Sequence, residues 1–87
     1  PYGNAITREK LDMVDKAEQY LLDLGFRQVR VRCHGNMARI EVSPEERKKF
    51  FDEKVMDGIA GKFREIGFIY TSLDLKGYRT GSMNEEL

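Results

Sequence analysis

The feature that most constrains this fold is a pair of alternating segments on either side of the dipeptide Gly35-Asn36. In residues 28–34 and 37–42, apolar residues alternate with polar or charged ones, and Met37 is the exception. A period of two indicates strands with one buried face, and Gly-Asn between two such runs favours a two-residue hairpin loop. The sequence therefore predicts a β-hairpin.

The register of this hairpin follows from counting outward from the loop. If Gly35 and Asn36 form the loop, residue 34 faces 37, residue 32 faces 39 and residue 30 faces 41. One face then carries Val29, Val31, Cys33, Ala38, Ile40 and Val42, and the other carries Arg30, Arg32, Arg39 and Glu41. A slip of one residue would mix the two faces, so the pattern specifies a single register.

Apolar residues at helical spacing predict one helix before the hairpin and one after it. The first begins at the N-cap residue Thr7 and ends at Gly25. The second opens at residues 43–46, where Ser-Pro-Glu-Glu combines a capping box with proline at the first helical position, and it ends at Gly67. A break near Asp52 is an alternative. The buried stripe of this helix is predicted to contain Phe51, Val55, Met56, Ile59, Phe63 and Ile66.

A third strand is predicted over residues 68–75, which completes the order α-β-β-α-β. This order predicts an α+β domain over residues 1–87, with a small three-stranded antiparallel or mixed sheet and two helices on one face. We place the third strand beside the first. A chain of 87 residues suffices for a single domain. The face with the arginines would be left uncovered.

Composition limits the partners of this chain. Fifteen basic and 15 acidic residues balance, so no general polyanion-binding surface is expected, and neither nucleic acid nor membrane is predicted as a partner. The single cysteine, Cys33, cannot form an intrachain disulfide, which fits the cytoplasm. A small nucleic-acid-binding module remains an alternative, against which the zero net charge and the lack of interleaved aromatic residues argue. Because the chain starts at Pro1, we expect it to be part of a longer protein.

The arginines on one hairpin face are the main candidate site. Guanidinium groups on a rigid strand can bind a phosphate or a carboxylate bidentately. The predicted register pairs Arg32 with Arg39, which is unfavourable, and Arg30 with Glu41, which is favourable. The alternative is a solvated sheet face without a ligand, and the pattern alone leaves both interpretations open.

Other chemically active residues give weaker signals. Cys33 and His34 are neighbours in a strand and point to opposite faces, so they could not easily share a metal, and Cys33 is expected in the core. The carboxylates of Glu18, Glu41 and Asp52 could converge only through tertiary packing. No phosphate-binding loop, nucleophile elbow or metal-ligand spacing occurs, so no catalytic residue is predicted in this chain.

Residues 24–42 (LGFRQVRVRCHGNMARIEV) resemble the C-terminal domain of LarE-type ATP-dependent sacrificial sulfur transferases, which belong to the PP-loop ATP pyrophosphatase superfamily. The start of the chain, Pro-Tyr-Gly, and residues 73–85 (LDLKGYRTGSMNE) resemble the corresponding parts of that domain. The resemblance covers essentially the whole chain. It is specific in the hairpin and the tail and loose in the two helices.

The resemblance implies a parent enzyme with an N-terminal PP-loop domain that is absent from this chain. That enzyme would use ATP and Mg²⁺ to adenylylate a pyridinium dicarboxylate mononucleotide and convert a carboxylate to a thiocarboxylate in nickel-pincer cofactor biosynthesis. Its sulfur would come from a sacrificed cysteine or from an iron–sulfur cluster. The family's sacrificial cysteine lies upstream of the segment that matches Pro1, so Cys33 is not that residue. The chain alone is expected to bind no cofactor and to be inactive.

The resemblance also implies roles for individual residues. Arg30 and Arg32 match arginines that hold the substrate phosphate, and we extend this role to Arg39 and, in the tail, to Arg79. A metal- or substrate-binding acidic cluster would include Glu18, Glu41 and Asp52. The implied partners are the PP-loop domain, a nucleotide-like substrate and further copies of the same chain in a homo-oligomer. The alternative is a purely structural oligomerisation module of a PP-loop enzyme, without ligand contacts.

Overall fold

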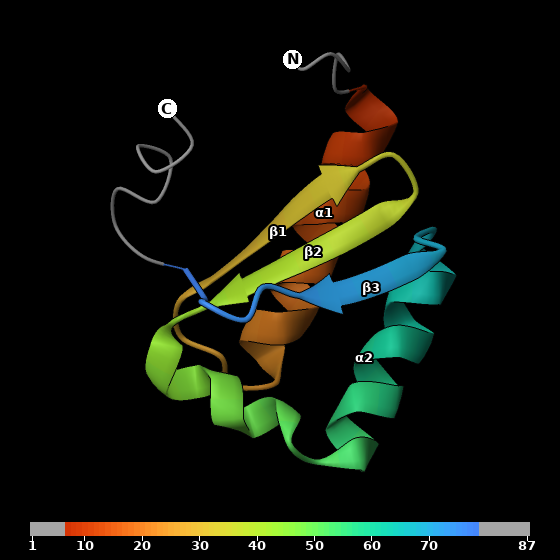
Figure 1. Ribbon diagram of the computed structural model, residues 1–87. Coiled ribbons are helices and arrows are strands. Elements are labelled where there is room, and N and C mark those ends of the chain that lie inside the picture. The colour runs from red at the N-terminus through yellow and green to blue at the C-terminus, as the bar shows by residue number, and fades with distance from the viewer. Residues whose placement is uncertain (1–6, 79–87) are drawn as a thin grey trace.

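The computed structural model describes residues 7–78 of the chain (Figure 1). Its elements are α1 (Arg8–Asp23), β1 (Val29–His34), β2 (Met37–Val42), the 3₁₀ helix η1 (Pro44–Phe50), α2 (Glu53–Ile66) and β3 (Tyr70–Leu73). The predicted α+β class is confirmed. Within residues 7–78, no helix combines the length and the apolar character needed to cross a membrane.

The three strands form one mixed sheet in the order β1-β2-β3. Strands β1 and β2 are antiparallel, and their register from Val29↔Val42 to His34↔Met37 is the one predicted from the hairpin loop. Strand β3 lies beside β2 and runs parallel to it, so the predicted position beside β1 is wrong. The outer edge of β1 is partly occupied, because the backbone N–H of Val31 donates to Glu18 Oε2 from α1 at 2.8 Å.

Both helices pack on the same face of the sheet, behind the strands in Figure 1. The core combines Ala17 and Leu21 from α1, Ile59 and Phe63 from α2, Val31, Ala38, Ile40 and Val42 from the hairpin, and Phe26, Phe50 and Phe68 from the connecting segments. The rings of Phe63 and Phe68 lie 5.9 Å apart, and those of Phe26 and Phe50 lie 5.1 Å apart. Cys33 lies at the margin of this core as a free, half-buried thiol.

The predicted second helix is divided into η1 and α2. Its N-terminal signal forms a different contact from the expected one, since Ser43 Oγ donates to Glu46 Oε1 at 2.7 Å and caps no backbone N–H. The α-helix begins later, at Glu53, after the N-cap residue Asp52, whose Oδ1 accepts from the backbone N–H of Lys54 at 2.8 Å. This break shifts the helical phase, so Phe51 and Met56, both predicted to be buried, are 84% and 44% exposed.

The third strand is shorter than predicted, because the chain turns after Leu73. Asp74 Oδ1 accepts from the backbone N–H of Lys76, and Gly77 follows with a φ of 86°. A Cβ on Gly77 would overlap the carbonyl oxygen of Val42, so this close approach requires glycine. The turn returns the chain to the end of β2.

Candidate functional site

The candidate site lies on the sheet face opposite the helices, which we call the arginine face. It consists of Arg30 and Arg32 on β1, Arg39 and Glu41 on β2, and Asp74 just after β3. Strand alternation places these side chains on one side, because their strand neighbours point into the core. The structure therefore brings together three of the four arginines predicted from the sequence. The fourth, Arg79, lies outside the described residues.

Glu41 is the central carboxylate of the arginine face. Glu41 is only 5% exposed, and its carboxylate accepts hydrogen bonds from Arg32 Nε at 3.3 Å and from Arg39 Nη2 at 3.0 Å. The predicted like-charge pair of Arg32 and Arg39 is present in the register and is compensated by this shared carboxylate. Glu41 thus binds both arginines rather than Arg30, its partner in the ladder.

Arg39 retains an unused donor. Its Nε is buried and has no hydrogen-bond partner among residues 7–78, and Asp74 Oδ2 lies 4.0 Å from it. A buried N–H without a partner costs free energy that an acceptor would recover.

Arg30 differs from the other two arginines. No hydrogen bond or ion pair between described residues involves its guanidinium group, which lies over the ring of Tyr78, 5.5 Å from the ring centroid. Tyr78 is fixed in turn by its backbone N–H, which donates to the carbonyl of Val42. Arg30 is therefore held in place while its N–H groups remain available.

The predicted acidic cluster is not assembled by the described part of the chain. Glu18 accepts from the edge of β1, Asp52 caps α2, and Glu41 lies between two arginines on the opposite face. Within residues 7–78, no group of three or more His, Cys, Asp or Glu side chains could hold a metal ion. The metal-binding role of these three carboxylates stays a prediction, and it would need ligands from elsewhere.

Among the described residues, Glu46 is the carboxylate with the most hydrogen bonds, and it was not predicted from the sequence as a notable residue. It is 6% exposed and accepts from Ser43 Oγ (2.7 Å), from the backbone N–H groups of Arg27 (2.8 Å) and Gln28 (3.1 Å), and from Lys49 Nζ (3.1 Å). Burial alone would raise the pKa of Glu46, but these four donors outweigh it and lower the pKa to about 2. The Ser-x-x-Glu motif was the available signal, and it was interpreted as a helix cap.

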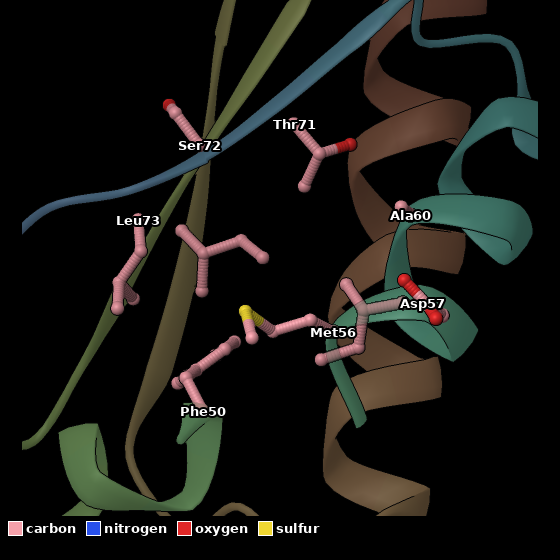
Figure 2. A pocket seen from close by; sticks show the side chains of 9 residues that line it. Phe50, Met56, Asp57, Ala60, Thr71, Ser72 and Leu73 are labelled. Carbon is pink, nitrogen blue, oxygen red and sulfur yellow. The ribbon is translucent and has the colours of Figure 1, made fainter. Parts of the chain in front are cut away.

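A hollow of about 310 Å³ lies between α2, η1 and β3 on the helix-covered side of the sheet. In Figure 2 the side chains of Phe50, Met56 and Leu73 point into it, and that of Ser72 points away. Its lining is mainly apolar and contains one carboxylate, that of Asp57. Because Leu73 and Ser72 alternate, this hollow and the arginine face lie on opposite sides of β3.

The central position of Glu41 can be tested by the substitution Glu41→Gln. We expect the free energy of unfolding to fall by about 1–3 kcal/mol, because two partly exposed arginines lose their shared acceptor but can still turn toward water. The affinity of the arginine face for inorganic phosphate should rise, because its net positive charge increases. Urea unfolding and a phosphate titration at low salt would measure both quantities.

The matched control is Glu65→Gln, which removes an exposed carboxylate on α2 that lies 3.9 Å from Lys62. It should leave both quantities nearly unchanged. A fall in phosphate affinity of the Glu41 variant with an intact fold would contradict the role of an internal counterion.

Comparison with protein-family models gave no match. Comparison with curated proteins gave an uncharacterized protein of Synechocystis sp., 46% identical over all 87 residues. It also gave pyridinium-3,5-bisthiocarboxylic acid mononucleotide synthase of Lactiplantibacillus plantarum, 44% identical over the same length. The chain spans about a third of these relatives, 32% and 31% of their lengths. The chain is thus homologous to a domain-sized part of the LarE-type enzymes, which include that synthase.

Proposed function

We propose that this chain is the C-terminal, substrate-binding domain of a LarE-like sulfur-insertion enzyme. Its arginine face would hold the phosphate of a pyridinium dicarboxylate mononucleotide, the substrate that the name of the L. plantarum relative suggests. The observation that carries this proposal is the arrangement of three guanidinium groups on a sheet face that no described element covers. One of them, that of Arg30, has no anionic partner among the described residues.

The arginine face suits a phosphate for a chemical reason. Arg30 is exposed and can present two parallel N–H groups to phosphate oxygens. Glu41 and Asp74 balance part of the positive charge, which keeps three arginines compatible with one small face. The role proposed for the chain is to bind and orient the substrate.

The parent enzyme would supply the chemical steps from another domain. Its N-terminal PP-loop domain would bind ATP and Mg²⁺, and adenylylation and thiolation would occur there. The described residues do not fit a Mg²⁺ site of their own, since Glu18, Glu41 and Asp52 are engaged separately. We therefore assign no step of the reaction to a metal held by this chain.

The proposal also includes assembly of the parent protein in the cytoplasm as a homo-oligomer. An uncovered sheet face is suited to contact with the PP-loop domain or with a second copy. A purely structural oligomerisation module would use the same face without a ligand. Arg30, which has no anionic partner within residues 7–78, favours the substrate-binding function, since an assembly surface does not require a guanidinium group of this kind.

The test is a titration of the 87-residue chain with nicotinic acid mononucleotide, followed through backbone amide NMR shifts. Shifts centred on Arg30, Arg32 and Arg39 are expected, and Arg30→Gln should weaken binding about tenfold or more, because a charge-assisted hydrogen bond contributes roughly 1.5–3 kcal/mol. The control Arg64→Gln, at the end of α2, should bind like the wild type.

Two outcomes would argue against this function. Equal losses in the Arg30 and Arg64 variants would indicate nonspecific attraction to positive charge. An absence of shifts at millimolar ligand would contradict a phosphate site carried by this chain and would favour the assembly module.

A further inference from the structure

We propose that Tyr78 is a positioning residue that holds the guanidinium group of Arg30 ready to bind a phosphate. The inference rests on the proposed function and deepens it, because it adds a residue to which neither the sequence pattern nor the comparisons assign a role. The geometry that points to it is the stacking of Arg30 over the ring of Tyr78, with 5.5 Å between the guanidinium carbon and the ring centroid.

Arg30 lies opposite a carboxylate that it does not bind. Its partner in the β1–β2 ladder is Glu41, and a direct ion pair would be favourable across the strands. Both oxygens of Glu41 are instead engaged, Oε1 by Arg32 and Oε2 by Arg39. In the described part of the chain, Arg30 therefore has no carboxylate to hold it, and the aromatic ring is what fixes its position.

The ring of Tyr78 is held by the turn that precedes it. The Tyr78 backbone N–H donates to the carbonyl of Val42, and the Gly77 N–H donates to the Asp74 carbonyl at 3.1 Å. Gly77 adopts a positive φ that brings the turn against β2 at a point where no Cβ would fit. Arg47 Nη1 also donates to the carbonyl of Leu75 at 2.6 Å, which ties the turn to η1. The ring is thus placed by a tightly bonded turn.

The contact with the Tyr78 ring fixes Arg30 without using its N–H donors. A guanidinium group that lies on an aromatic face keeps its N–H groups at the edge free to donate. An arginine that is already fixed loses less conformational freedom when a phosphate binds than one that moves in solvent. Tyr78 would accordingly strengthen phosphate binding without touching the phosphate.

The experiment compares Tyr78→Phe and Tyr78→Leu in the 87-residue chain, with nicotinic acid mononucleotide as the probe. Tyr78→Phe keeps the ring and should bind like the wild type. Tyr78→Leu removes it and should raise the Kd by roughly two- to fivefold, the equivalent of an exposed cation–π contact. The Arg30 side-chain Nε resonance should also shift or broaden in the leucine variant alone. Tyr70→Leu is the matched control, because Tyr70 is 67% exposed at the start of β3.

The outcomes separate this inference from the proposed function. If the wild type binds, Arg30→Gln loses binding and Tyr78→Leu binds as tightly as the wild type, the positioning role is rejected and the phosphate site stands. If Tyr78→Phe loses as much affinity as Tyr78→Leu, stacking is not the cause and the inference is also rejected. If the wild type binds no mononucleotide, both are rejected. Equal melting temperatures of the leucine and phenylalanine variants would show that a difference in Kd does not come from unfolding.

Discussion

Replacing Phe63 by alanine is expected to lower the free energy of unfolding by about 3–5 kcal/mol, the usual cost of removing a buried aromatic side chain. Phe63 is fully buried in α2 and lies 5.9 Å from Phe68, ring to ring. Because a domain of this size has a total stability of only about 5–15 kcal/mol, the variant should be largely unfolded near body temperature if the wild type lies at the lower end. Urea or thermal unfolding followed by circular dichroism measures this loss.

The control is the same substitution at an exposed position, Phe51→Ala. Phe51 is 84% exposed between η1 and α2, so its loss should change the stability by no more than about 0.5 kcal/mol. A large loss at Phe51 would indicate that this side chain is buried against a second molecule in solution. A small loss at Phe63 would contradict the described core.

The second large effect is expected for Glu46→Gln, and it should depend on pH. The pKa of Glu46 is lowered from 4.5 to about 2 in the folded protein, which corresponds to roughly 3 kcal/mol at most. Screening of the half-exposed Lys49 reduces this figure to about 2 kcal/mol. At neutral pH the glutamine variant should be less stable by this amount, because an amide cannot accept from all four donors.

The lowered pKa of Glu46 determines how the stability of the fold changes with pH. Between about pH 4.5 and pH 2 the unfolded chain binds a proton at Glu46 that the folded chain does not, so the stability of the wild type falls as the pH falls. The difference between wild type and Glu46→Gln should be constant above about pH 5 and should narrow toward pH 2. Urea unfolding at several pH values tests this, with the exposed neighbour Glu45→Gln as the control. A difference that does not change with pH would show that the charge of Glu46 is not what stabilises the fold.

Local patterns in the sequence predicted the hairpin and its face of arginines correctly. A period of two and a Gly-Asn loop specify a register, and that register determines which side chains share a face. Caps were predicted less well, because Ser43 and Glu46 match a capping box and yet bond each other beside Arg27 and Gln28. The Ser-x-x-Glu motif can form either a helix cap or a side-chain hydrogen bond such as this one, and the tertiary packing decides which of the two occurs.

The partners of the charged side chains could not be read from the register. The ladder places Arg30 opposite Glu41, but Glu41 binds Arg32 and Arg39, since long side chains reach diagonally and along a strand. Tyr78 is far from Arg30 in sequence, and its contact depends on the turn at Gly77. The position of β3 was missed for a related reason, because strand order depends on which edge of the hairpin α1 leaves open.

The parallel placement of β3 has a consequence for the order in which the chain folds. Strands β1 and β2 pair across a two-residue loop, and such hairpins form in about 1–10 μs. The segment between β2 and β3 contains η1 and α2, so β3 can pair with β2 only after this segment has folded back across the sheet. The pairing of Met37 with Tyr70 therefore joins residues that are far apart in the sequence. Closing such a long loop delays its contacts relative to local ones. The hairpin is therefore expected to form first, and the Arg30 side chain should gain its fixed position only when the last segment brings the ring of Tyr78 against it.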